Sequence, residues 1–156
     1  MKRLSLTRLP PTLLVIGVPL LACSGLSRGV ALETVPTELV EVQLQGTQLV
    51  IDQPCEAANG ALSIRGGDTL LENLGQEVVT YQITGATRSD RTVTLEVALD
   101  GEPQPAFILR RSKKQQHELY FVEREGSPAR DVPEMFVDAR ESANFQTIKE
   151  DCPPIE

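Results

Sequence analysis

The sequence predicts an all-β fold, mainly antiparallel: a small meander barrel or curved sandwich of about seven strands with a short C-terminal helix. From Leu39 onward, apolar and polar residues alternate with a period of two, which is the period of a half-buried strand. Turn signals rich in Gly, Asn and Asp separate these runs at a spacing of roughly 8–12 residues, as in small barrels and sandwiches. Two neighbouring runs carry apolar residues on one face and threonines on the other, so they can pair and cover a core.

The first 22 residues precede this fold and are predicted to be a secretory signal peptide. Lys2, Arg3 and Arg8 form a basic head, and an apolar run over residues 13–23 follows it. That run is too short to cross a bilayer as a helix, which needs about 20 residues. A basic head, a short apolar body and a small-residue exit match the secretory pattern. The alternative, a buried N-terminal helix, is disfavoured because three prolines would break its hydrogen bonds.

The segment Leu20–Cys23 resembles the lipobox of bacterial lipoproteins, in which the cysteine thiol receives a diacylglyceryl group and the signal is cut just before it. Leu20 and Ala22 match the pattern, whereas the leucine between them departs from it. The resemblance implies lipidation at Cys23, and Ser24 resembles the sorting pattern of outer-membrane lipoproteins. It therefore implies an exported, membrane-anchored chain that faces the periplasm or the cell exterior, with the outer membrane favoured if the host has one. The alternative is ordinary cleavage after Ser24.

The rest of the chain is long enough for one domain. We expect residues 23–36, which are small and polar, to be a tether, and residues 37–156 to form a single β-rich domain. The 156-residue chain has a net charge of −7; without the signal it has 12 Lys and Arg against 22 Asp and Glu, a net charge of −10. We expect no binding to nucleic acid, because that affinity depends on basic residues that neutralise phosphates.

Cys55 and Cys152 are predicted to form a disulfide. They remain as an even pair once Cys23 is assigned to the signal region, and an exported chain folds in an oxidising compartment. The bridge would close a loop of roughly 100 residues, worth up to about 4.7 kcal/mol in the chain-entropy model. A reactive redox pair is the weaker alternative, because the chain has no Cys-x-x-Cys motif.

The domain is expected to open with short strands separated by turns. In residues 40–44, three apolar residues alternate with Glu41 and Gln43, as in a half-buried strand, and a second apolar run covers residues 49–51. An Asn-Gly pair and a Gly-Gly-Asp triplet then mark turns before two further short apolar runs.

The clearest hairpin pairs residues 79–83 with residues 93–99 across a turn at residues 88–91. In both runs, apolar residues alternate mainly with Thr, Gln or Glu. A slip of one residue in the register would turn the apolar set to water and bury Glu96, whose unpaired burial is costly. The side chains predicted to face inward are Tyr81, Ile83, Val93, Leu95 and Val97.

The C-terminal third is expected to hold a last hairpin, a helix and a closing strand. Residues 106–111 and 118–123 flank a polar turn and form the hairpin. A short helix is expected to begin at Pro133 and run toward Arg140, because proline and an acidic residue both favour the first helical turn. Residues 145–148 are expected to form a closing strand.

One basic cluster stands out from the acidic background: Arg110, Arg111, Lys113 and Lys114. It is a candidate patch for contact with anionic lipid headgroups or with an acidic partner. The alternative, which we favour on sequence alone, is a hairpin turn whose lysines prevent pairing at a sheet edge.

No enzymatic activity, cofactor or metal site is expected. His117 is the only histidine and is expected at a solvated hairpin tip, whereas a zinc site needs several His or Cys ligands. The chain has no nucleophile motif and no phosphate-binding glycine loop. A small secreted hydrolase would have only scattered carboxylates for its chemistry.

The leading hypothesis is a non-enzymatic exported envelope lipoprotein, a membrane-tethered binding or assembly module with an envelope protein as its partner. The alternative is a soluble periplasmic protein that binds a small hydrophobic ligand inside the barrel, or an inhibitor. The meander resembles lipocalin-like small barrels in outline, without a motif specific to that family. An apolar cavity would favour the alternative, and lipidation of Cys23 the leading hypothesis.

Overall fold

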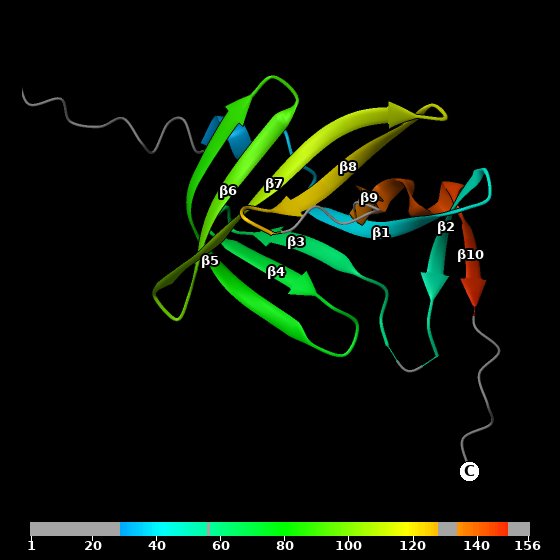
Figure 1. Cartoon of the computed structure of the whole chain (residues 1–156), viewed down its shortest axis with the longest axis horizontal. Helices are drawn as coiled ribbons and strands as arrows, with labels where there is room; N and C mark the ends of the chain where they lie inside the picture. The colour runs from blue at the N-terminus through cyan, green and yellow to red at the C-terminus, as the bar shows by residue number, and fades with distance from the viewer. Residues whose placement is uncertain (1–28, 56, 128–133, 150–156) are drawn as a thin grey trace, which may run out of the picture.

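A computed structural model describes residues 29–55, 57–127 and 134–149 of the chain. In these ranges the chain forms ten strands and one short 3-10 helix, η1 (Figure 1). The elements are β1 Glu38–Gln45, β2 Gln48–Gln53, β3 Ala61–Arg65, β4 Thr69–Asn73, β5 Val78–Ser89, β6 Thr92–Leu99, β7 Glu102–Lys114, β8 His117–Arg124, β9 Glu134–Asp138, η1 Ala139–Asn144 and β10 Gln146–Lys149.

Eight of these strands close a barrel. Their order is β1-β3-β4-β5-β6-β7-β8-β9, and β9 pairs back onto β1, with every neighbouring pair antiparallel. The far end of β1 leaves the barrel and pairs with β2, which in turn pairs in parallel with β10. The predicted all-β, mainly antiparallel fold is confirmed, with a second small sheet that the sequence does not reveal.

The predicted central hairpin is confirmed as β5 and β6. Its turn is tighter than expected, because β5 continues to Ser89. A bulge between Ile83 and Gly85 shifts the pairing of β5 with β6 by one residue, and the Glu96 side chain folds over Gly85. A Cβ atom on Gly85 would lie 2.9 Å from the Glu96 Cδ atom, so a larger residue at position 85 would displace this exposed side chain. All five residues predicted to face inward are buried: Tyr81, Ile83, Val93, Leu95 and Val97.

The predicted last hairpin is also confirmed as β7 and β8, and a further hairpin joins β6 to β7. Both use turns with left-handed backbone. Asp100 and Gly101 connect β6 to β7 with φ of 52° and 85°. Gln115 and Gln116 connect β7 to β8 with φ of 51° and 71°. Paired positive φ values twist a two-residue turn in the direction that flanking strands require.

The strand β1 contributes to two separate cores because its two faces pack on different layers. Leu39 and Glu41 face the barrel interior, while Val42 lies outside it in a second apolar cluster. That cluster is closed by β2, by β9 and by Phe145 beyond η1. The sequence does not distinguish these faces, and Leu44 at the end of the expected apolar face is 43 % exposed.

The expected helix from Pro133 to Arg140 is wrong in its position. The described part of that segment begins as β9, since Met135, Phe136 and Val137 are all buried and complete the barrel. The short C-terminal helix is η1, and Asp138 caps it by accepting hydrogen bonds at 3.0 Å from the backbone nitrogen and the Nε of Arg140. These bonds, with the side-chain bond the strongest cause, hold the pKa of Asp138 below its usual value.

Residues 29–36 were expected to belong to the tether of residues 23–36, but they pack against the barrel. Residues 29–32 form a helical turn, and Ala31 and Val35 are 1 % and 6 % exposed in the barrel core. Thr34 donates from Oγ1 to the carbonyl of Ala31 at 2.8 Å. We call the end of the barrel that this segment closes the plug end, and the opposite end the mouth.

Candidate functional site

A pocket of about 260 Å³ lies at the mouth of the barrel. It is bounded by β1, β3, β4, β8 and β9, by β2 beside them, and by the connection between β2 and β3. Apolar side chains form part of its wall, including Leu62, Val122 and Phe136 from the barrel interior and Leu74 from the β4–β5 turn. Leu74 is 60 % exposed and Val78 beside it 58 %, so the rim has an apolar side.

Four carboxylates also line the pocket: Glu41 of β1, Asp52 of β2, Glu72 of β4 and Glu134 of β9. The amide side chains of Gln43, Asn59 and Asn73 add polar groups to the same wall. None of the described residues that line it is Lys, Arg or His. The pocket is therefore strongly acidic, with a partly apolar wall.

The position of Glu41 is fixed by close packing against the β2–β3 connection. Its backbone nitrogen donates to the Gly60 carbonyl at 2.8 Å, and Asn59 Nδ2 donates to the Glu41 carbonyl at 2.9 Å. The Glu41 side chain lies directly over Gly60, where a Cβ atom would come 3.1 Å from the Glu41 Cδ atom and closer still to Oε2. A glycine at position 60 thus leaves the space that the Glu41 carboxylate occupies.

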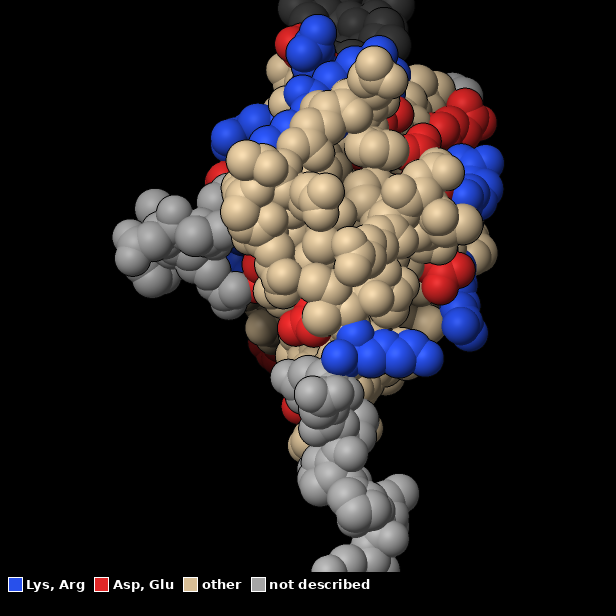
Figure 2. Space-filling view, turned by 90° about the vertical axis from the view of Figure 1, so that its right-hand side faces the viewer, with Lys and Arg blue, Asp and Glu red and all other residues tan. Residues whose placement is uncertain are grey.

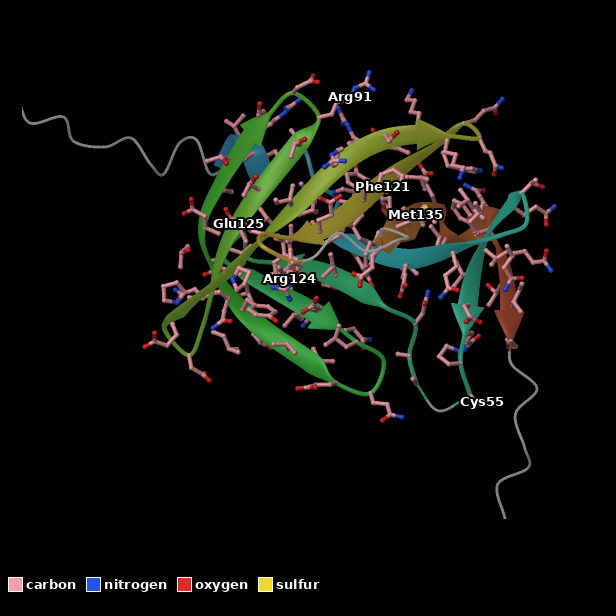
Figure 3. All side chains as sticks on the ribbon, viewed as in Figure 1. Cys55, Arg91, Phe121, Arg124, Glu125 and Met135 are labelled. Carbon is pink, nitrogen blue, oxygen red and sulfur yellow. The ribbon has the colours of Figure 1, made fainter. Side chains whose placement is uncertain are left out.

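Glu72 is held by a polar cluster inside the barrel. Arg124 Nη2 donates to Glu72 Oε2 at 2.5 Å and contacts Tyr81 Oη at 3.0 Å, and Tyr81 Oη donates to the same Glu72 oxygen at 3.1 Å. The Arg124 guanidinium also lies over the Phe107 ring, 3.4 Å from its centroid. Arg124 comes from the end of β8 near the barrel mouth (Figure 3). These contacts fix one carboxylate of the pocket in place.

The size and the lining of the pocket suit the binding of a small cationic group. Its volume is slightly below the roughly 300–1,000 Å³ of sites for drug-sized ligands, so it fits a smaller group. Carboxylates and amide oxygens accept hydrogen bonds, and they favour an ammonium or guanidinium donor. In the described part of the chain, no three His, Cys, Asp or Glu side chains are grouped so that they could hold a metal ion.

The predicted basic patch is divided between the two faces of β7. Arg110 pairs with Glu123 of β8 at 3.5 Å, and Arg111 with Glu118 at 3.1 Å. Lys113 and Lys114 end the strand, and no carboxylate of the described residues lies within ion-pair distance of either.

Two further arginines join this patch at the plug end. Arg111 donates its backbone nitrogen to the Arg91 carbonyl at 2.8 Å, and a small depression there is lined by Arg88, Arg91 and Arg111 together with Tyr120. Burial raises the pKa of the Tyr120 hydroxyl and Glu118 raises it further, while Arg111 opposes both. The two ends of the barrel thus carry opposite charge.

The expectation that His117 is a solvated tip residue is wrong. It is the first residue of β8, its side chain is 29 % exposed, and its ring packs on Phe145 at a centroid distance of 4.5 Å. Its Nδ1 lies 3.8 Å from the Glu141 carboxylate of η1. His117 therefore helps to dock the C-terminal segment rather than forming a site.

The cysteine predictions fall largely outside the described residues. Cys23 and Cys152 lie outside them, so the signal peptide, the lipidation at Cys23 and the disulfide remain predictions. Cys55 follows the end of β2 and is described (Figure 3). Because β10 runs parallel to β2 with Lys149 beside Gln53, both strands lead toward the same end of their sheet.

The pocket is not apparent in the sequence, because its residues are ordinary in their local context. Glu41 alternates with valines as a solvent-facing residue would, and Glu72 ends a short apolar run. A usable signal was the Asn-Gly pair at residues 59 and 60, which was interpreted only as a turn and also makes room for Glu41.

In comparisons with protein families, with curated proteins and with solved structures, the chain matches none of them. Among the described residues, the structure contains no helix of the length and apolar character needed to cross a membrane.

Proposed function

We propose that this chain is an exported, non-enzymatic lipoprotein whose barrel is a membrane-tethered binding module, and that its mouth pocket binds a compact cationic group. That group would be a Lys or Arg side chain of an envelope partner, or a small polyamine. The signal peptide and the lipobox-like segment ending at Cys23 support the tether.

The observation that carries the binding proposal is the convergence of four carboxylates on one pocket. Glu41, Glu72 and Glu134 come from three strands of the barrel and Asp52 comes from β2 beside it, so barrel closure and the pairing of β1 with β2 together bring them to one pocket. A pocket with several acceptors and a partly apolar wall suits an alkylammonium or a guanidinium on its aliphatic stem. The exposed Leu74 and Val78 on the rim offer apolar contact to the partner surface around that group.

The hydrophobic-ligand alternative receives no support from the barrel interior. Leu70, Ile83, Leu95 and Phe107 fill it and are each at most 1 % exposed. The plug segment closes the opposite end through Ala31 and Val35. The space that remains is the acidic pocket. An apolar ligand bound there would displace water from the carboxylates, and that desolvation costs free energy.

The binding proposal is tested by calorimetric titration of the purified full chain with spermidine. We expect saturable binding that weakens by about tenfold or more when Glu41→Gln and Glu134→Gln are combined, since each loses a charge-assisted acceptor. The matched control is Glu125→Gln combined with Glu102→Gln, which removes two exposed charges from the mouth end without touching the pocket.

We expect the control chain to bind spermidine within about twofold of the parent, a difference well under 1 kcal/mol. Equal weakening in both chains would show general attraction of a polycation to an acidic protein and would contradict a pocket. Absence of saturable binding to the parent chain would contradict it as well.

A further inference from the structure

Several basic side chains outside the mouth pocket lie at the plug end and on both faces of the adjoining part of β7. We name this set the basic ridge: Arg88, Arg91, Arg110, Arg111, Lys113 and Lys114. It follows β5, β6 and β7 and continues along the part of β7 that extends beyond its pairing with β6. Several Lys and Arg side chains lie along the upper edge of the molecule in Figure 2, and Arg91 lies at the top of Figure 3.

The ridge keeps an excess of positive charge after its ion pairs are counted. Arg110 and Arg111 are paired with Glu123 and Glu118, and Asp90 lies in the turn between Arg88 and Arg91. Glu33 of the plug segment is also exposed, so six basic groups stand against four acidic ones in a chain whose overall net charge is −7. Within the described ranges, the side chains of Arg91, Lys113 and Lys114 have no hydrogen bond or ion pair.

The number of residues between Cys23 and the plug segment limits how far the ridge can lie from the proposed anchor. The plug segment begins at Gly29, and Thr34 and Val35 line the same depression as Arg88, Arg91 and Arg111. Figure 1 shows the helical turn of the plug segment behind the end of β5, next to the β5–β6 turn. Gly29 is six residues after Cys23, which is at most about 20 Å of extended chain.

We propose that the basic ridge faces the anionic headgroups of the membrane that anchors the chain, so that the acidic mouth points away from the membrane. The inference rests on the proposed tether at Cys23. A short tether holds the plug end within the range where headgroup charge acts on basic residues. The carboxylates around the mouth are repelled by the same headgroups, so both ends of the barrel favour one orientation. The pocket is then presented to partners.

Tryptophan substitution gives a direct test, because the chain contains no tryptophan. Ser89→Trp marks the ridge and Gln76→Trp marks the mouth, and both positions are exposed. The eight residues of β6 separate the two ends by about 25 Å. Each full chain is purified from membranes and reconstituted on vesicles of phosphatidylcholine with phosphatidylglycerol that carry dansyl-labelled headgroups. Energy transfer from tryptophan to dansyl reports proximity to the surface.

We expect transfer from the Ser89→Trp chain to exceed that from the Gln76→Trp chain by about threefold or more, given the ~25 Å between the two positions. High salt, vesicles of phosphatidylcholine alone, or Arg88→Glu with Arg91→Glu should each bring the ratio down toward one. Lys149→Glu, a charge reversal at the end of β10 and outside the ridge, should leave the ratio unchanged.

Two kinds of failure are distinguishable. If the parent chain does not float with phosphatidylcholine vesicles, there is no lipid anchor; the proposed tether fails and this inference fails with it. If the chain floats but the two positions transfer equally, or the ratio is indifferent to headgroup charge and to Arg88→Glu with Arg91→Glu, the ridge does not orient the barrel, and the tether stands.

Discussion

At the scale of single residues, Arg124 organises the barrel mouth. Its guanidinium joins Glu72 and Tyr81 by hydrogen bonds and covers the Phe107 ring. The side chains of Arg124 and Glu72 are 26 % and 13 % exposed, so this ion pair is largely removed from solvent. When one partner is removed, the other stays desolvated with no opposite charge beside it. The free-energy cost of that unpaired charge exceeds the stability that the intact ion pair contributes.

We predict that Arg124→Met lowers the free energy of unfolding by roughly 2–3 kcal/mol, below the 3–5 kcal/mol of fully buried pairs because solvent reaches this one. Methionine keeps most of the aliphatic stem but removes the guanidinium, so the single loss includes the contact with the Phe107 ring as well as the charge. The double substitution Arg124→Met with Glu72→Leu should recover much of it, since no carboxylate is then left unpaired. Denaturant melts of the three chains measure this.

Arg110→Met is the matched control, because Arg110 pairs with Glu123 on the outside of the same hairpin with side chains 56 % and 45 % exposed. It should change stability by no more than about 0.5 kcal/mol. If the double substitution costs as much as the two single ones added together, Arg124 acts through packing and the account of the mouth is wrong.

Residue types alone could not have revealed this cluster. Tyr81 was predicted to face inward from the alternation around it, and it does. Its partners Glu72 and Arg124 are separated from each other by 52 residues, and each resembles a solvated charge at a strand end. Only the closure of the barrel brings them together, and that depends on pairings that no local pattern encodes.

At the scale of elements, the β5–β6 pair is the part of the fold that the sequence predicts best. Leu95 is 0 % exposed in the barrel core, while Glu96 beside it is exposed and lies over Gly85 at the bulge. We predict that Leu95→Ala lowers the free energy of unfolding by about 2–5 kcal/mol, the usual cost of a cavity in a packed core. Glu96→Ala should cost less than about 0.5 kcal/mol.

The comparison of the two substitutions by denaturant melts tests the register of the pair as well as burial. A slip of one residue exchanges the two faces of the strand. Glu96→Ala would then cause the larger decrease in the free energy of unfolding, and Leu95→Ala the smaller one. Similar small losses from both would contradict a packed barrel interior at β6.

Other elements show where alternation alone is insufficient. The pattern around Val40 and Val42 correctly indicates a strand, but it does not say that a second sheet covers those valines while Glu41 faces a pocket. Pro133 and Glu134 favour the start of a helix, yet the three consecutive buried residues 135–137 complete a strand between β1 and β8. Tertiary pairing outweighs local preference at both places.

At the scale of the whole molecule, the acidic mouth lies opposite the end that carries the basic ridge, and the proposed tether joins the chain on the side of the ridge. The parallel pairing of β2 with β10 places Lys149 beside Gln53, so these two strands end on the same side of their sheet. The disulfide between Cys55 and Cys152 stays a prediction from the sequence.

The central claim is that the chain is a lipid-tethered barrel, and intact-mass measurement of the chain purified from the membrane fraction tests it most directly. The account predicts a polypeptide that begins at Cys23 and carries a diacylglyceryl group with its acyl chains, with the mass of two hydrogens missing for a Cys55–Cys152 disulfide and restored on reduction. The Cys23→Ser chain, prepared in the same way, should no longer be recovered in the membrane fraction. An unmodified chain that begins at Gly25, or one that retains its first residues without lipid, would contradict the account.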